Sequence, residues 1–195
     1  VRAITNFSSG RMGYAVAAAA VASGATVTLV SGPVSLDVPH GVNRISVKSA
    51  EEMRSAVLSE IANTDIFIGV AAVADYRPKS QVSKKIKKDD NKMTIELVKN
   101  PDILSEVSAH QDRPFVVGFA AETDNLEKNA LSKLKKKKLD MIAANKVGGT
   151  TPGFGDKPNE LIVFCANGDK HELPMTDKNH LARQLVSLIS SNLPA

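Results

Sequence analysis

Apolar and polar positions are arranged in blocks along this chain, with short apolar runs of strand length separated by longer stretches that have helical spacing. The run Asp65–Val73 contains no polar or charged side chain after its first residue. Such a run is typical of a strand buried on both faces of a parallel sheet. The strands that we expect from these runs are Ala3–Thr5, Thr26–Val30, Asn43–Val47, Asp65–Val73, Phe115–Ala120, Met141–Asn145, Leu161–Cys165 and His171–Leu173.

The stretches between these runs carry start and stop signals for helices. Ser49, followed by Glu52 three residues later, has the pattern of a capping box, and Gly24 suits the C-terminal cap of the preceding helix. Pro101 stands where proline is favoured, at the first position of a helix. We expect helices over Met12–Ser23, from Ser49 to about Asn63, from Pro101 onward, over Leu126–Lys138 and from about Lys178 to Ser191.

Strands separated by helices of this length imply βαβ units with right-handed crossovers. The sequence therefore predicts one α/β domain over residues 1–195, a Rossmann-like three-layer sandwich with a mostly parallel sheet. The last two strands flank Asn167-Gly168, so we expect them to form an antiparallel hairpin at the sheet edge. Residues 77–98 break the alternation, and we expect a lysine-rich excursion with one strand at Met93–Val98 that covers a site or reaches a partner subunit.

Composition narrows the classes of function. With 43% apolar residues the chain can bury one core, and with 4% aromatic residues and no Trp it offers few stacking platforms for single-stranded nucleic acid. Its net charge is only +4, and its lysines are crowded into Lys84–Lys88 and Lys133–Lys138. This distribution favours local anion sites over nucleic-acid binding. The single Cys165 fits a reducing cytoplasm, and no apolar run approaches the roughly 20 residues that span a bilayer. We therefore expect a cytoplasmic protein with no membrane partner.

The segment Asn6–Gly13 leads from the first expected strand through a polar turn into an alanine-rich helix. Such a junction directs backbone N–H groups and the positive end of the helix dipole at one point, which suits a phosphate. Gly10 lets the backbone approach a phosphate, although the glycines also have a purely structural interpretation as turn residues. A dinucleotide site would need an acidic residue after the second strand, where Ser31 and Gly32 stand, so NAD binding is disfavoured.

Other motifs carry weaker signals. Asp75 follows a buried strand and suits a ribose hydroxyl or a phosphate-bound Mg²⁺, although its spacing alone favours an ordinary loop or cap residue. Lys133 and Lys137 lie four residues apart, on one helix face, where they can jointly receive a triphosphate. Phe119 suits either a nucleotide base or the core. The run at Lys85–Lys88 is by itself more typical of a solvated surface than of a site.

Taken in order, these motifs resemble those of the phosphopantothenoylcysteine synthetase family, which provides the ligase step of coenzyme A biosynthesis. The resemblance covers essentially the whole chain, and Arg11 stands where many relatives have Lys. The motifs that carry it are Asn6-Phe7-Ser8-Ser9-Gly10, Ala71-Ala72-Val73-Ala74-Asp75-Tyr76, Lys85-Ile86-Lys87-Lys88, Lys99-Asn100-Pro101-Asp102-Ile103, Gly118-Phe119-Ala120-Ala121-Glu122-Thr123 and Asn145.

The resemblance implies an enzyme that joins 4′-phosphopantothenate to L-cysteine, with CTP as cosubstrate and Mg²⁺, through an acyl-cytidylate intermediate. It also implies a homodimer that forms through the sheet edge and the excursion. Bacterial members often carry a flavin-dependent decarboxylase domain upstream. We interpret the start at Val1 as that of a fragment which lacks such a domain, and we expect no flavin in it.

The same resemblance assigns residues to roles. It implies that Asn6, Arg2 and Lys85 are catalytic, and that Asp75 is the candidate metal ligand together with nucleotide phosphates. The acyl intermediate and its phosphate-facing loop are assigned to Asn6, Ser8, Ser9, Gly10, Ala71 and Ala72. Nucleotide binding is assigned to Gly69, Val70, Ala71, Asp75, Lys85, Pro101, Asp102, Ile103, Leu104, Phe119, Lys133 and Lys137.

Two alternative functions are weighed against the ligase. One is a Rossmann-type NAD(P)-dependent oxidoreductase, which would bind NADPH. The other is a non-catalytic nucleotide-sensing module, which would bind CTP without releasing pyrophosphate. The choice between CTP and ATP depends on backbone contacts near Ala71 and Phe119, which residue types alone do not specify.

Overall fold

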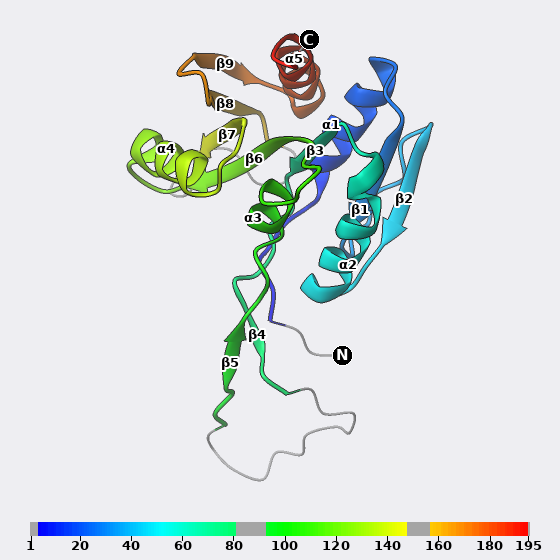
Figure 1. Ribbon diagram of the computed structural model, residues 1–195, viewed down its shortest axis with the longest axis vertical. Helices are drawn as coiled ribbons and strands as arrows, with labels where there is room; N and C mark the ends of the chain where they lie inside the picture. The colour runs from blue at the N-terminus through cyan, green and yellow to red at the C-terminus, as the bar shows by residue number, and fades with distance from the viewer. Residues whose placement is uncertain (1–3, 81–92, 148–156, 195) are drawn as a thin grey trace.

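A five-stranded central sheet organises the computed structural model, which describes residues 4–80, 93–147 and 157–194 (Figure 1). Its strand order is β3-β6-β7-β8-β9. Strands β3 (Ile66–Gly69), β6 (Phe115–Glu122) and β7 (Met141–Lys146) are parallel, and β8 (Asn159–Cys165) and β9 (Lys170–Thr176) form an antiparallel hairpin at the edge. The predicted α/β class and the edge hairpin are therefore confirmed.

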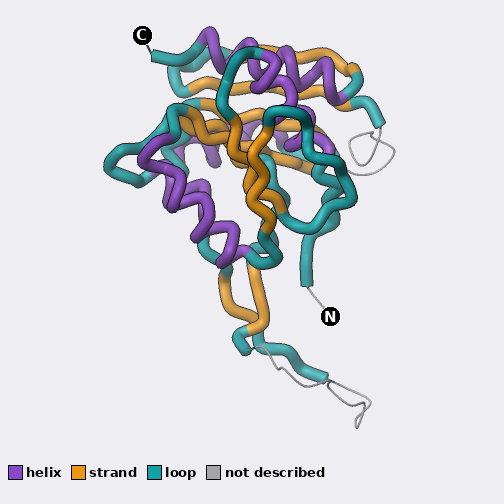
Figure 2. Tube along the Cα trace, turned by 90° about the vertical axis from the view of Figure 1, so that its right-hand side faces the viewer, coloured by secondary structure: helices purple, strands orange, loops and turns teal. Residues whose placement is uncertain are grey.

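Side chains of the central strands alternate between two hydrophobic cores, one on each face of the sheet. Val117 and Met141 pack with α1 (Arg11–Ala22) and α5 (Lys178–Ser191). Their neighbours Val116 and Ile142 belong to the core on the other face. That core is covered by α2 (Ala50–Glu60), α3 (Ile103–Ser108) and α4 (Leu126–Lys136). Helices thus cover both faces, and the three layers are visible in Figure 2.

A separate two-stranded sheet lies beside α2 and contains β1 (Val27–Ser31) and β2 (Val42–Ser46), which pair in parallel. The strand predicted at Ala3–Thr5 is not formed, because Ile4 and Thr5 have no ladder partner and Ile4 is 49% exposed, while Ala3 lies outside the described residues. Without a strand there, β1 and β3 are not joined within the described residues. As a result β1 is only partly buried.

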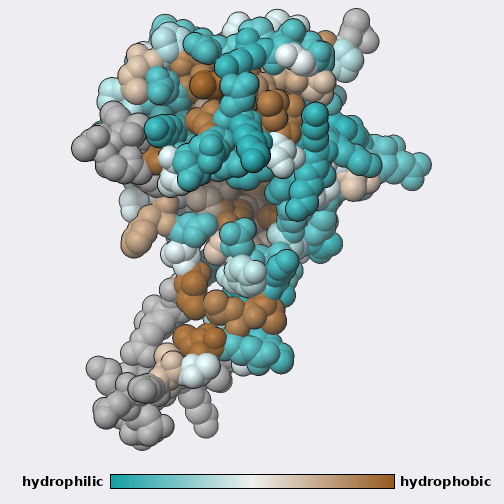
Figure 3. All heavy atoms as spheres, turned by 90° about the vertical axis from the view of Figure 1, so that its left-hand side faces the viewer, coloured by the Kyte–Doolittle hydropathy of each residue, from teal (hydrophilic) through white to brown (hydrophobic). Residues whose placement is uncertain are grey.

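A two-stranded arm projects from the body below α3 (Figure 1). Its strands are β4 (Tyr76–Pro78) and β5 (Leu97–Lys99), which pair antiparallel, and we use "arm" for the described residues 76–80 and 93–99. The described ends of the predicted excursion leave the sheet as expected, and its residues 81–92 lie outside the described residues. The strand expected over Met93–Val98 is limited to β5. A space-filling view shows apolar side chains gathered on the arm (Figure 3). They include Tyr76, Met93, Ile95 and Leu97, all more than 40% exposed.

Two further predictions differ at their boundaries for local reasons. The helix expected from Pro101 begins at Ile103, because the Asp102 side chain accepts a hydrogen bond from the Ser105 N–H at 3.2 Å and is therefore the N-cap. The strand expected over Asp65–Val73 ends at Gly69, the last position at which β3 pairs with β6. Beyond it the chain leaves the sheet toward the arm.

The helix predicted after Ser49 is confirmed with its cap. Ser49 Oγ accepts a hydrogen bond from the Glu52 N–H at 3.1 Å, and the helix continues as a 3₁₀ turn over Ile61–Asn63. Within residues 4–80, 93–147 and 157–194, no helix combines the length and the apolar character that a membrane span requires.

Candidate functional site

The loop that precedes α1 is joined to the chain that leaves β3. Asn6 donates a hydrogen bond from its side-chain amide, Nδ2, to the backbone oxygen of Val73 at 3.2 Å, across 67 positions of sequence. Both Ala71 and Ala72, which the family resemblance assigns to the acyl intermediate, are exposed just before this contact. Open α/β sheets bind ligands at the carboxyl ends of their parallel strands. This contact lies just beyond the carboxyl end of β3, and we use "rim" for this edge of the sheet.

Asn100 fixes the next two residues after Val73. Its Nδ2 donates to the Ala74 carbonyl at 2.7 Å, and its backbone N–H donates to the Asp75 carbonyl at 2.8 Å. Arg77 in turn donates to Asn100 Oδ1 and forms an ion pair with Glu51 of α2. The Asp75 side chain is exposed on a turn whose backbone is held by these bonds. Asn100 itself had no role in the sequence-based assignment, and the one signal for it was its place in a recognised motif.

The predicted phosphate-facing loop borders a groove of about 360 Å³. Ser8 Oγ accepts a hydrogen bond from the Gly10 N–H at 3.3 Å, and Gly10 has φ +73° as the N-cap of α1. The opposite wall of the groove is Pro33–Leu36, which was not identified from the sequence. The Gly32-Pro33 turn after β1 was the available signal for it.

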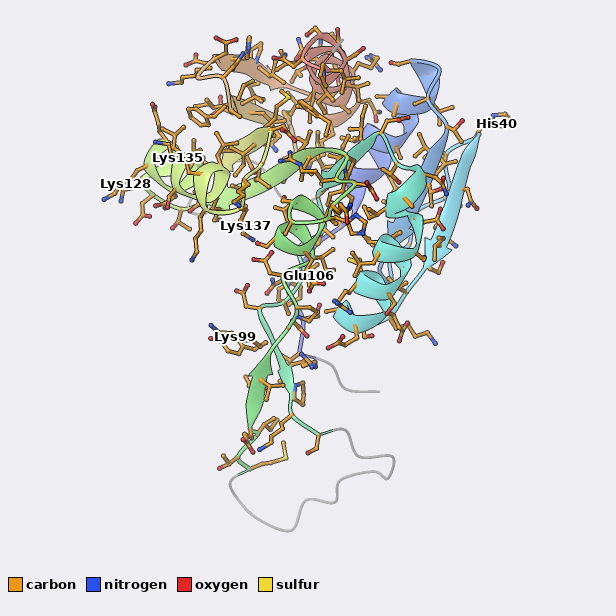
Figure 4. All side chains as sticks on the ribbon, in the orientation of Figure 1. His40, Lys99, Glu106, Lys128, Lys135 and Lys137 are labelled. Carbon is orange, nitrogen blue, oxygen red and sulfur yellow. The ribbon has the colours of Figure 1, made fainter. Side chains whose placement is uncertain are left out.

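Lys133 and Lys137 each meet a carboxylate from a different motif. Lys133 Nζ lies 2.6 Å from Glu122 Oε1, at the end of β6. Lys137 Nζ lies 2.9 Å from both carboxylate oxygens of Asp102, the N-cap of α3. In Figure 4 Lys137 lies between α4 and α3, whereas Lys135 lies at the outer side of α4. The interpretation that Lys133 and Lys137 differ from the lysines between them is consistent with these contacts.

The crowding of lysines at this helix end also has a structural cause. Lys133, Lys135 and Lys136 occupy the last turn of α4, and Lys137 is its C-cap residue. Positive charge near a helix C-terminus is favourable because the dipole places partial negative charge there. The helix dipole therefore favours lysines at this position, and the ion pairs of Lys133 and Lys137 direct these two toward the rim.

Several other assigned residues are placed by packing. Gly69 and Gly118 are register partners, and a Cβ on Gly118 would lie 2.8 Å from a Leu139 methyl and 3.0 Å from one of Leu104. Glycine at these positions therefore lets Leu104 of α3 pack close to the sheet. Phe119 packs against the core on the opposite face, beside α1 and α5. The structure thus places Phe119 and Leu104 on opposite faces of the sheet.

The remaining assigned residues differ in what they offer a ligand. Ile103 is 8% exposed and packs in the core covered by α3 and α4, so its side chain offers little surface to a ligand. Asn145, near the end of β7, donates a hydrogen bond from Nδ2 to Asn159 Oδ1 at 3.5 Å. Arg2 and Lys85 lie outside the described residues.

The electrostatics of the two ion pairs set the ionisation of their acids. Burial by itself would raise the pKa of Glu122, but hydrogen bonds from Lys133 and Asn129 outweigh it and hold the pKa below its ordinary value of 4.5. For Asp102, burial likewise opposes hydrogen bonds from Lys137 and Ser105, and the net effect is a lowered pKa. Both carboxylates are therefore negative at neutral pH.

This lowering predicts an acid-dependent loss of stability. A carboxylate whose pKa is lower in the folded state stabilises the protein above its unfolded pKa, and this contribution is lost as pH falls through the folded value. We expect the free energy of unfolding, measured with urea from pH 6 to pH 3, to fall less steeply in Glu122→Gln than in the unsubstituted protein. Equal slopes would contradict the ion pair.

Comparison with known proteins identifies extensive similarity. A model of the DNA/pantothenate metabolism flavoprotein C-terminal domain family matches residues 1–193. The coenzyme A biosynthesis bifunctional protein CoaBC of Vibrio cholerae is 53% identical over 99% of this chain and 49% of its own length. That of Escherichia coli K12 is 50% identical over 97% of this chain and 47% of its own length. This chain therefore spans about half the length of the curated relatives that it matches.

Solved structures agree with the fold. A crystal structure of the C-terminal domain of CoaBC superposes with a TM-score of 0.82 at 40% identity, covering 98% of this chain and 86% of that one. The Cab2 mutant H337A in complex with phosphopantothenate-cysteine gives a TM-score of 0.76 at 15% identity, covering 98% and 80%. The latter similarity concerns the fold alone.

Proposed function

This chain belongs to the DNA/pantothenate metabolism flavoprotein C-terminal domain family, and from that premise we propose that it is the phosphopantothenate–cysteine ligase of coenzyme A biosynthesis. The reaction joins 4′-phosphopantothenate to L-cysteine and uses CTP. The substrate carboxylate attacks the α-phosphorus of CTP, forming an acyl-cytidylate and releasing pyrophosphate. The cysteine amine then attacks the acyl carbon and CMP leaves with its bonding electron pair.

The observation that carries the proposal is the continuous set of contacts along one rim. Asn6 meets Val73, Asn100 meets the Asp75 backbone, and Asp102 meets Lys137. These contacts bring three of the recognised motifs together with Lys137, although they are far apart in sequence. A rim of this kind can hold two anionic substrates side by side, and holding reactants in place supplies a large part of the rate enhancement in such reactions.

Each group on this rim has a proposed role. Lys133 and Lys137 offset the charge of the triphosphate, which otherwise repels the substrate carboxylate. Asn6 offers a neutral amide N–H to the developing charge on the acyl oxygen. Catalytic roles are also proposed for Arg2 and Lys85, which lie outside the described residues. The Ser8–Gly10 loop and the backbone of Ala71 and Ala72 hold the acyl intermediate.

Further proposed contacts recognise the cytosine base or bind the nucleotide through residues near the ends of strands. Backbone groups near Ala71 and Phe119 select cytosine. The other proposed nucleotide contacts come from Gly69, Val70, Asp75, Pro101, Ile103 and Leu104, and from the backbone of Asp102.

Mg²⁺ is proposed to bind through nucleotide phosphates and Asp75. Among the residues that the structure describes, no group of three or more acidic, His or Cys side chains forms a complete metal site. The exposed Asp75 carboxylate fits the usual binding of Mg²⁺ by one or two carboxylates, phosphates and water. When bound, the ion supplies charge neutralisation for the phosphates.

Pyrophosphate release tests the function directly. With 4′-phosphopantothenate and CTP, we expect pyrophosphate to form, and with cysteine added we expect CMP and the amide product. We expect faster release of pyrophosphate with CTP than with ATP. CTP binding without pyrophosphate would favour a nucleotide-sensing module, and binding of NADPH in place of CTP would favour an oxidoreductase.

We also propose that the protein is a cytoplasmic homodimer and that the arm contributes to the interface. An isolated two-stranded hairpin is marginally stable in water, and the arm exposes Met93, Ile95 and Leu97 at 62%, 47% and 42%. A second copy of the chain would cover them. The upstream decarboxylase domain of the bifunctional relatives is a further proposed partner, fused in the same polypeptide.

Replacing both Ile95 and Leu97 by Lys is expected to shift the dimer toward monomer, because charge would be buried at the interface. Sedimentation velocity over a concentration series measures this shift. The control is Leu193→Lys, which changes a 36% exposed residue after α5, outside both the sheet edge and the arm. Equal dissociation by Leu193→Lys would contradict a role of the arm in the interface.

A further inference from the structure

The two lysines that we assign to the triphosphate are both paired with carboxylates, but the two pairs differ in burial and in their other partners. We propose that Asp102 is a displaceable partner that competes with nucleotide phosphates for Lys137, whereas Glu122 is a positioning residue that keeps Lys133 in place for them. This inference rests on the proposed function and adds a role for two acids at the same site.

Glu122 is held on both sides of its carboxylate. The Glu122 side chain is 12% exposed, its Oε1 accepts from Lys133, and its Oε2 accepts from Asn129 Nδ2 at 2.9 Å. Its backbone oxygen also accepts a hydrogen bond from the Val147 N–H at 2.9 Å, which fixes this end of β6. Removing Lys133 from Glu122 would leave a largely buried charge with one neutral donor, which is costly. The pair therefore stays together when a nucleotide binds.

Asp102 can lose its lysine at little cost. Its side chain is 50% exposed, and its Oδ1 still accepts the Ser105 N–H at the start of α3 when Lys137 moves away. Exposed ion pairs of this kind contribute little because water replaces the lost partner. Lys137 is the C-cap residue of α4, one turn beyond Lys133, so both ammonium groups can face one triphosphate.

Lys137 leaves Asp102 only for a ligand that offers it several negative oxygens. A triphosphate brings several negative oxygens to Lys137 and can outcompete one carboxylate, whereas Lys133 already points to the rim without rearrangement. Asp102 then lowers the affinity for nucleotide, and Glu122 raises it. Asp102 and Glu122 carry the same charge and each pairs with a lysine, yet they have opposite effects on nucleotide affinity.

The test measures CTP dissociation constants by calorimetry, together with KM and kcat from pyrophosphate release, in the unsubstituted protein, Asp102→Asn and Glu122→Gln. Asn caps helices as well as Asp does, so Asp102→Asn removes charge and keeps the α3 cap. We expect Asp102→Asn to lower the dissociation constant about threefold, within the range of an exposed ion pair. We expect Glu122→Gln to raise KM for CTP about tenfold with little change in kcat.

Double variants show whether each acid acts through its lysine. In a Lys137→Met background Asp102→Asn should have no further effect, and Glu122→Gln should have none in Lys133→Met. Glu122→Asp, which keeps the charge, should restore part of the affinity and also serves as the readout if Glu122→Gln does not fold.

Three results would overturn the inference. The first is weaker CTP binding in Asp102→Asn, and the second is tighter CTP binding in Glu122→Gln. The third is a change in the Mg²⁺ concentration that Glu122→Gln needs for activity, because this would indicate that Glu122 is a metal ligand. Failure of the unsubstituted protein to bind CTP or release pyrophosphate would instead contradict the proposed function. Normal behaviour of the unsubstituted protein with unchanged variants would contradict this inference alone.

Discussion

Gly10→Ala is expected to lower ligase activity about 100-fold and to cost about 3 kcal/mol of stability. Gly10 adopts φ +73°, where a side chain strains the backbone, and a Cβ there would lie 2.9 Å from Val34 Cγ1. Relief of this contact moves the Ser8–Ser9 loop away from Pro33–Leu36 and opens the groove that we assign to phosphate. Pyrophosphate release and urea unfolding measure the two effects.

Gly24→Ala is the matched control for this prediction. Gly24 also has positive φ, at +90°, but no heavy atom lies within 4 Å of the position that a Cβ would occupy there. The substitution therefore adds backbone strain of about 1–2 kcal/mol without a collision, and activity should stay near normal below the melting temperature. If both variants lose activity equally, the loop geometry at Gly10 has no special role.

Lys137→Met is expected to raise KM for CTP by ~10- to 100-fold, because a hydrogen bond between charged groups contributes ~1.5–3 kcal/mol. Methionine keeps the unbranched apolar stem and removes the ammonium group. Asp102 loses its ion-pair partner, yet it is half exposed and keeps the Ser105 N–H, so stability should change little. Steady-state kinetics with CTP as the varied substrate measure the effect.

Lys135→Met is the control, since Lys135 lies on the outer side of α4 in the same helical turn (Figure 4). Its replacement removes the same charge from the same helix end without removing a contact to the rim. KM should then change by less than about twofold. Equal effects of the two substitutions would mean that the lysine run attracts nucleotide only through its summed charge.

Most helices and strands could be predicted from the sequence, because the interactions that start and end them join residues a few positions apart. The Ser49–Glu52 capping box, the Asn167-Gly168 turn and the spacing of apolar residues in Lys178–Ser191 each act over a few positions, and each element is confirmed. Asp102 shows the limit of such signals. Both Pro101 and Asp102 fit a helix start, and the contact between Asp102 and the Ser105 N–H decided the boundary.

The candidate site was predictable as a set of motifs and much less as a set of contacts. Asn6, Asp75 and Lys137 were named from the resemblance, and the structure places them along one rim. Asn100 and Glu122 lie in recognised motifs, but neither was assigned a role from the sequence. The role of an amide or a carboxylate depends on the group to which it binds in the fold. That group lies 26 residues away for Asn100 and 11 for Glu122.

Residue order along the chain was enough to predict the α/β alternation, the helix caps, the edge hairpin and the family motifs, since each depends on neighbours in sequence. The folded protein was needed to show that Ile4 and Thr5 form no strand, that Gly69 and Gly118 give Leu104 room to pack, and that Lys137 forms an ion pair with Asp102. The physical reason is that strand pairing, close packing and ion pairs depend on distances across the fold, and these arise only when separate elements come together.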